Sequence, residues 1–163
     1  MIIQAETPAQ IEDARRLFRE YEAWLGVDLC FQSFKEELKN LPGKYAAPTG
    51  RLFLVLVENQ LAGCAALRKL DDDICEMKRL FVREQFRGSG LGKILVERLI
   101  EDAKIIGYRK MRLDTLHDKM PRAVELYALY GFRKIKPYYE NPHKETLFME
   151  LNLKRKALTP PAN

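Results

Sequence analysis

The sequence has few cysteines and no long hydrophobic run. Cys30, Cys64 and Cys75 are odd in number and lack the paired spacing of a zinc site. We therefore interpret them as buried, reduced thiols, and we expect no metal. No apolar run approaches the roughly 18 residues that span a bilayer, and the N-terminus lacks the basic-then-apolar order of a secretion signal. These absences predict a cytoplasmic protein without a membrane partner.

The composition and the net charge indicate what kind of protein this is and which partners it attracts. The chain has 163 residues, of which 47% are hydrophobic and 31% charged, as in one globular domain. The net charge of +5 attracts anions, including nucleic acids and phosphorylated cofactors. The interleaved aromatic and basic residues of a nucleic-acid surface are missing, so we expect no nucleic-acid partner. We divide the chain into a domain over 1–153 and a basic, flexible tail over 154–163.

Hydrophobic periodicity and turn residues predict an α+β fold. A capping box between Thr7 and Gln10 starts a first helix, and Gly26 ends it. Three strands follow with links too short for a parallel crossover, so they must be antiparallel. A shorter helix is expected at 31–38, before these strands. The strands cover 51–58, 61–70 and 74–82, and are followed by a helix to about 106, a strand at 110–116, a helix at 122–130 and a strand at 145–153. We expect a mixed, mostly antiparallel central sheet flanked by helices, with one parallel βαβ unit.

A glycine-rich turn at 87–93, RGSGLGK, joins the third strand to the long helix. Such a turn directs backbone N–H groups and the positive end of the helix dipole at one spot, which favours an anion. The three glycines let a phosphate approach closely, while Arg87 and Lys93 supply positive charge. The spacing differs from GxGxxG and from GxxxxGK[ST]. We interpret the turn as a phosphate site rather than as a flexible helix entrance.

Two segments resemble the GCN5-related N-acetyltransferase (GNAT) superfamily. The pattern Arg87-x-x-Gly90-x-Gly92, preceded by MKRLFV at 77–82, is similar to the acetyl-CoA-binding signature of that family. Downstream, AVELYALYGF at 123–132 is similar to its A-x-x-L-Y-x-x-x-G-F segment. The resemblance extends over 1–153 in the order of the elements. It implies a GNAT-like fold and acetyl-CoA as co-substrate.

The resemblance also implies where acetyl-CoA binds. Backbone groups of Leu80, Phe81 and Val82 would pair with the pantetheine arm as an added strand does. Amides of the turn would hold the pyrophosphate, and they belong to Arg87, Gly88, Ser89, Gly90, Leu91, Gly92 and Lys93. The family often has asparagine three residues before the alanine that matches Ala123. Met120 stands there in this chain, so one polar contact is expected to be absent or supplied by another residue.

Acetyl transfer to an amine needs a base for the ammonium and a proton donor for the departing thiolate. Glu76 aligns with a glutamate that is the base in some relatives, and its alternative role is an exposed strand residue paired with lysine. Tyr127 matches the tyrosine that protonates the thiolate, and the N–H near Leu80 would polarise the thioester carbonyl. No covalent enzyme intermediate is required, so Cys75 is not expected to be a nucleophile.

Several other residues are weaker candidates for substrate contacts. Asp114, Thr115 and His117 lie at or just after the end of a predicted strand, where substrate contacts are often found, but a surface position explains each of them better. The aromatic loop at 138–142 lies where relatives hold the acceptor amine. Trp24 is expected in the core.

We expect an N-acetyltransferase that acts on a primary amine of a small molecule or amino acid, because the chain has no accessory domain that would hold a protein. A protein or peptide amine is the alternative acceptor, and a non-catalytic acyl-CoA-binding module is the alternative class. The sequence is also compatible with a homodimer.

Overall fold

The computed structural model describes residues 1–30 and 33–153. The predicted tail at 154–163 and the first two residues of the helix predicted at 31–38 lie outside this part of the chain. The described residues form a seven-stranded sheet with the order β1-β2-β3-β4-β5-β7-β6. The strands are β1 (Ile2–Gln4), β2 (Arg51–Val57), β3 (Gln60–Lys69), β4 (Ile74–Val82), β5 (Lys110–Leu116), β6 (Arg133–Ile135) and β7 (Thr146–Asn152). The α-helices are α1 (Pro8–Leu25), α2 (Phe34–Lys39), α3 (Leu91–Ile106) and α4 (Pro121–Leu129).

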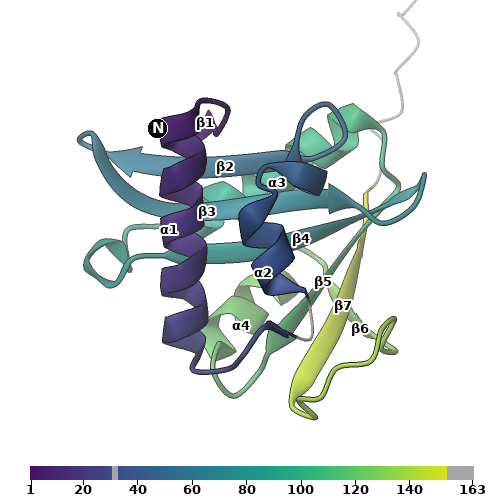
Figure 1. The fold of residues 1–163 in the computed structure, drawn as a ribbon. Helices are drawn as coiled ribbons and strands as arrows, with labels where there is room; N and C mark the ends of the chain where they lie inside the picture. The colour runs from purple at the N-terminus through teal and green to yellow at the C-terminus, as the bar shows by residue number, and fades with distance from the viewer. Residues whose placement is uncertain (31–32, 154–163) are drawn as a thin grey trace, which may run out of the picture.

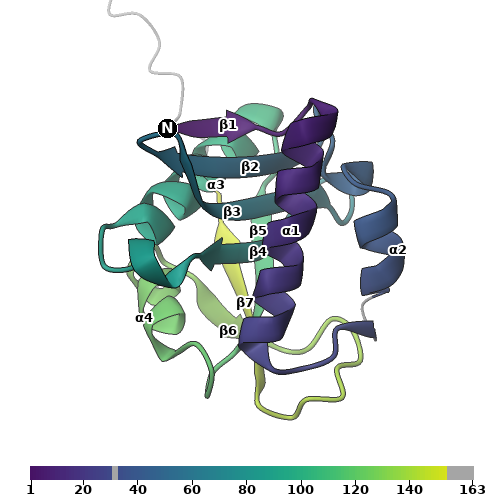
Figure 2. The same cartoon turned by 60° about the vertical axis from the view of Figure 1, so that its left-hand side comes forward.

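Helices cover both faces of the sheet, with α1 and α2 on one face and α3 and α4 on the other (Figures 1 and 2). Side chains alternate along each strand, so one strand supplies two cores. In β2, Leu52 and Leu54 pack in the core beneath α1, whereas Phe53 and Val55 pack in the core beneath α3. The sheet thus connects two hydrophobic layers.

The predicted fold class is confirmed. Strands β1 to β4 are antiparallel, and β4 pairs with β5 in parallel. The capping box is also present: Thr7 Oγ1 accepts a hydrogen bond from the Gln10 N–H at 3.2 Å. Sequence reasoning missed the short strand β6 and the insertion of β7 between β5 and β6. It was also wrong about Cys30, whose side chain is exposed, while Cys64 and Cys75 are buried as predicted.

Strands β4 and β5 diverge after a short ladder. Their pairing ends at Glu76 and Arg112, although β4 continues to Val82. The register of β4 against β3 shifts nearby, and Arg79 has a φ of 60°, in the left-handed region. An irregularity of this kind bends a strand away from its neighbour. The resulting opening lies next to the glycine-rich turn.

Candidate active site

The glycine-rich turn forms an open backbone cradle at the start of α3. Gly90 is the N-cap of this helix with a φ of 83°, and Gly88 has a φ of 82°. Both values favour glycine because L side chains rarely adopt them. A Cβ at Gly88, Gly90 or Gly92 would meet no protein atom within 4 Å. The first helical turn leaves N–H groups without partners inside the helix, so the cradle can bind an anion.

A groove continues from this cradle along β4 to α4. Its walls include most of the residues predicted to bind acetyl-CoA: Leu80, Phe81, Val82, Arg87, Gly88, Gly90, Leu91 and Gly92. Ala123 and Leu126 of α4 form part of the opposite wall. Two predicted residues, Ser89 and Lys93, do not line the groove. Ser89 Oγ donates a hydrogen bond to the Phe86 carbonyl at 2.5 Å, and the Lys93 side chain is exposed.

Trp24 lies in this groove, which corrects the expectation that it is a core residue. Its side chain is 42% exposed, and the Arg87 guanidinium carbon lies 4.7 Å from the centre of its ring. Arg87 Nε also donates to the Val82 carbonyl at 2.8 Å. Arg87 therefore occupies a strand carbonyl that the sequence assigns to the pantetheine arm. Arg122 is a further groove residue that sequence reasoning missed. It comes just before the AVELYALYGF segment at 123–132, and nothing in the sequence distinguishes it from a surface arginine.

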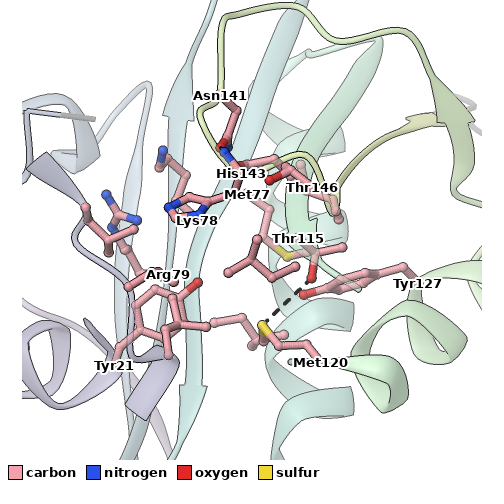
Figure 3. Close-up of a pocket in the computed structure, with 17 residues that line it drawn as sticks. Tyr21, Met77, Lys78, Arg79, Thr115, Met120, Tyr127, Asn141, His143 and Thr146 are labelled. Atoms are coloured by element: carbon pink, nitrogen blue, oxygen red, sulfur yellow. Dashed lines mark hydrogen bonds between the residues drawn. The ribbon is translucent and has the colours of Figure 1, made fainter. Parts of the chain in front are cut away.

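A second cavity lies at the opening between β4 and β5. Strand β4 contributes Met77 to Leu80, and β5 contributes Leu113 to Leu116. Figure 3 shows Lys78 and Arg79 on one side of the cavity and Thr115, Met120 and Tyr127 on the other. The remaining wall comes from Tyr21, Leu25, Val27, Leu29, Asn141, His143 and Thr146. The loop after β6, predicted to lie near the acceptor, therefore does contribute to this cavity.

Tyr127 lies on α4 and points into the second cavity (Figure 3). It is 4% exposed, and burial raises the pKa of its hydroxyl above the ordinary value of 10.0. The phenol therefore stays protonated at neutral pH, which is the form that can donate a proton. Thr115 Oγ1 donates to the Met120 sulfur at 3.8 Å beside it. Met120, the residue expected to leave one polar cofactor contact unfilled, thus has a polar partner of its own.

Glu76 is fully buried and does not line the second cavity. Its carboxylate accepts from Arg68 Nε at 2.8 Å and from the Tyr138 hydroxyl at 2.6 Å, and Lys78 Nζ lies 3.8 Å away. Burial by itself raises the pKa of Glu76, but Lys78, Arg68 and Tyr138 outweigh it, so the net pKa lies below the ordinary 4.5. Glu76 is therefore an ionised carboxylate that does pair with a lysine, yet it is not exposed.

Further charged pairs lie on the same face of the sheet. Arg79 donates to both oxygens of Glu37, at 2.9 and 3.0 Å. Arg112 Nε donates to Glu150 at 2.8 Å. Asp114, in the cavity wall, accepts a hydrogen bond from the Tyr139 hydroxyl. This face is thus a polar layer next to the opening between the strands.

Two other predicted candidates differ in their positions. Thr115 lines the second cavity, but His117 lies in a separate depression near β6 and β7. Burial raises the pKa of the Cys75 thiol to about 12, so it is protonated at neutral pH and unsuited to nucleophilic attack. Within the described residues, no group of three or more His, Cys, Asp or Glu side chains is placed to hold a metal ion. No helix in this part of the chain is long and apolar enough to cross a bilayer.

The described residues thus form an anion cradle at a helix N-terminus, a groove along an opened strand and a neighbouring cavity that contains a buried tyrosine. The model of the acetyltransferase (GNAT) family matches residues 11–132, and the chain belongs to this family of acetyltransferases. An N-acetyltransferase of Dictyostelium discoideum is 34% identical over 91% of this chain and 97% of its own length. One of Schizosaccharomyces pombe is 38% identical over 94% of this chain and 95% of its own length.

Solved structures agree with this assignment. A GNAT-family acetyltransferase of Staphylococcus aureus superposes with a TM-score of 0.78 over 94% of this chain and 99% of that one, at 23% identity. A GNAT-family acetyltransferase of Elizabethkingia anophelis, solved with acetyl-CoA bound, has a TM-score of 0.55 and 26% identity over 64% of this chain and 77% of that one. The fold is therefore shared with a family member that binds acetyl-CoA.

Proposed function

We propose that this acetyltransferase moves an acetyl group from acetyl-CoA to a primary amine of a small molecule by direct attack. The proposal rests mainly on one observation: the groove and the second cavity adjoin each other, because Leu80 and Met120 line both of them. A donor held in the groove would present its thioester at this junction, and an acceptor in the second cavity would reach it from the other side.

The chain's own groups suit the donor. The cradle at Gly88 to Gly92 offers backbone N–H groups and the helix dipole to the pyrophosphate. Arg87 and Arg122 add positive charge at the groove. The edge of β4 that faces the opening offers its backbone to the pantetheine amides, and the N–H near Leu80 can polarise the thioester carbonyl. The Val82 carbonyl already accepts a hydrogen bond from Arg87 Nε, so a donor molecule that binds there would share the carbonyl with Arg87 or displace it.

The reaction requires one base and one acid. We assign the base to Asp114 rather than to the predicted Glu76, because Asp114 lines the cavity and Glu76 does not. The acceptor ammonium gives a proton to Asp114, directly or through water, and its nitrogen attacks the thioester carbon. A C–N bond forms, the C–S bond breaks, and the nitrogen loses its second proton to solvent. The sulfur takes a proton from Tyr127, Tyr127 is reprotonated from solvent, and Asp114 gives its proton back to solvent, so one proton is released overall.

The acceptor is assigned to the small-molecule class from the walls of the cavity. Tyr21 of α1 closes one side, and Asn141 and His143 of the loop between β6 and β7 close another. Lys78 and Arg79, which lie in the wall, are both less than 10% exposed. A site enclosed by α1 and by this loop suits a compact acceptor better than a folded protein.

Two measurements test the proposed function. Acetyl-CoA at about 100 times its Kd should stabilise the protein by about 2.7 kcal/mol, seen as a higher melting temperature. Thiol release from acetyl-CoA over a panel of amines, amino acids and peptides should show turnover with small acceptors. No shift in melting temperature, or no thiol release with any acceptor, would contradict the proposal.

The role of Tyr127 is tested by Tyr127→Phe, which removes the proton donor and keeps the ring. We expect kcat to fall about 100-fold, with little change in the KM for acetyl-CoA. Tyr130→Phe is the matched control, because the Tyr130 hydroxyl donates to Glu97 at 2.6 Å outside the cavity. Equal turnover by Tyr127→Phe and the wild type would remove Tyr127 from the mechanism.

A further inference from the structure

The second cavity receives opposite charges from two facing strands. The β4–β5 ladder ends at Glu76 and Arg112. Side chains alternate along a strand, so the next residues on the same face are Lys78 of β4 and Asp114 of β5. Both line the cavity. A positive and a negative side chain therefore face the same enclosed space across the opening where the acetyl group is transferred.

The neighbouring charges are matched among themselves. Of the other charged groups on this face, Arg68 is bonded to Glu76 at 2.8 Å, and Arg112 to Glu150 at 2.8 Å. Arg79, the third charged residue of the cavity wall, is held by Glu37, and its guanidinium lies 5.0 Å from the Phe34 ring centre. These pairs are built into the fold. Lys78 and Asp114 also have partners in the fold: Lys78 Nζ lies 3.8 Å from the Glu76 carboxylate, and Asp114 accepts a hydrogen bond from the Tyr139 hydroxyl. Since both residues line the cavity, a ligand there would still meet the positive charge of Lys78 on one side and the negative charge of Asp114 on the other.

Burial strengthens the preference of Lys78 for an anionic group on the ligand. The Lys78 side chain is 5% exposed, and a desolvated ammonium interacts far more strongly with an anion than an exposed one does. Burial and the nearby Arg79 lower the pKa of Lys78, and the Glu76 carboxylate, 3.8 Å from Lys78 Nζ, opposes this lowering. A plain alkylammonium would bring another cation close to Lys78. An acceptor that also carries a carboxylate would avoid this repulsion.

A hydroxyl in the same wall supports a polar ligand. Thr146 Oγ1 is buried and has no hydrogen-bond partner among the described residues. Buried hydroxyls in folded proteins are usually satisfied, so an exception in a binding cavity indicates a missing ligand or water atom. Asn141 and His143 add polar groups to the same part of the wall.

We propose that the acceptor is a free amino acid, with its amine facing Asp114 and its carboxylate facing Lys78. This inference rests on the proposed function and narrows its substrate class. The carboxylate would accept from Lys78 Nζ, and the Thr146 hydroxyl would supply a further hydrogen bond at the polar wall. The ammonium group would lie beside the Asp114 carboxylate, which accepts its proton. A peptide N-terminus and a decarboxylated amine both lack the group that Lys78 binds.

Matched acceptors test this inference with the full-length protein. With acetyl-CoA saturating, thiol release is measured for each of several L-amino acids, for its amide and for its decarboxylated amine. The three share the same reacting amine group. We expect the best amino acid to exceed its amide and its amine in kcat/KM by about 10- to 100-fold, the contribution of a charge-assisted hydrogen bond. Equal kcat/KM for an acid and its amide would overturn the inference while leaving the proposed function intact.

Removing the charge of Lys78 tests whether this residue recognises the carboxylate of the acceptor, and the acetyl-CoA-induced melting-temperature shift tests whether the variant is still folded. Lys78→Met should raise the KM for the amino acid about 10- to 100-fold, so that the acid and its amide are used about equally. Lys78→Arg should restore part of the preference, and Lys69→Met is the control on an exposed lysine of β3. An unchanged melting-temperature shift with acetyl-CoA shows that the donor site is intact. A preserved preference in Lys78→Met would overturn the role of Lys78. Absence of thiol release with every acceptor would instead refute the proposed function.

Discussion

Glu76 is held by side chains from two other parts of the fold, Arg68 and Tyr138, which bind the same carboxylate. Arg68 lies on the neighbouring strand β3, directly opposite Glu76 in the register. Tyr138 comes from the loop after β6, far along the chain. These partners make Glu76 a structural anchor for the polar layer around Lys78.

This arrangement predicts how stability depends on pH. The pKa of Glu76 is lowered in the folded state, so its contribution to stability is present above the unfolded value of about 4.5 and is lost as the pH falls through the lower folded value. Glu76→Gln leaves Arg68 and Lys78 without their counter-charge and should cost about 3 kcal/mol at neutral pH.

Thermal unfolding of Glu76→Gln and the wild type from pH 7 to pH 3 checks this expectation. The difference between the two melting temperatures should shrink below pH 4.5. Glu101→Gln, a change on the exposed side of α3, is the control and should leave the melting temperature unchanged at every pH. A difference that is constant over the whole range would contradict the assignment of the lowered pKa to Glu76.

At the scale of elements, the glycine-rich turn must both start helix α3 and leave room for a phosphate. One substitution can separate these two requirements. Gly92 lies in the first turn of α3 with ordinary helical backbone, and a Cβ there would meet no protein atom within 4 Å. Gly92→Ala should therefore stabilise the helix by about 0.5 kcal/mol. The same methyl group would point into the phosphate cradle, so the KM for acetyl-CoA should rise about tenfold.

Gly26→Ala is the matched control for this prediction. Gly26 ends α1 with a φ of 68°, where alanine is strained by about 1 kcal/mol, and it lies outside the cradle. It should lower the melting temperature and leave the KM for acetyl-CoA unchanged. If Gly92→Ala binds acetyl-CoA as tightly as the wild type does, the phosphate does not sit against this turn.

The arrangement of elements was more predictable than their side-chain contacts. The links between β2, β3 and β4 are too short for a crossover, which predicted antiparallel pairing. The long helix between β4 and β5 is enough for a crossover, which predicted their parallel pairing. The three-residue strand β6 is too short to leave a periodic pattern, and the place of β7 depends on contacts with β5. Trp24 was misplaced because helical spacing cannot show that the end of α1 borders a groove along β4.

Trp24 also reports on the groove, because it is the only tryptophan in the chain. Its ring is 42% exposed and is covered on one side by Arg87. Bound acetyl-CoA should displace Arg87 from the Val82 carbonyl and shield the ring from water. We expect tryptophan emission to shift to shorter wavelength on titration with acetyl-CoA, with a midpoint equal to the Kd from the thermal shift. A free amino acid without acetyl-CoA should cause no shift, and unchanged emission at saturation would place the donor elsewhere.

At the scale of the whole molecule, one sheet supports both hydrophobic cores. Leu17 of α1 lies in the core beneath α1, and Leu99 of α3 lies in the core beneath α3; both are completely buried. Because β2 and β3 place alternate side chains in the two layers, neither layer can lose its packing without disturbing the other. The opening between β4 and β5 is held by this shared frame, so the active site should persist until the whole domain unfolds.

This coupling predicts a single unfolding transition that responds to changes on either face. Leu17→Ala and Leu99→Ala should each cost about 2 to 5 kcal/mol, and each kcal/mol should lower the melting temperature by about 2 to 4 °C for a domain of this size. Ile105→Ala, on the same helix as Leu99 but 74% exposed, should have almost no effect. Calorimetry on each variant checks the prediction. A second, separate transition in either core variant would show that the two layers unfold independently, and the donor and acceptor sites would then lose their geometry at different temperatures.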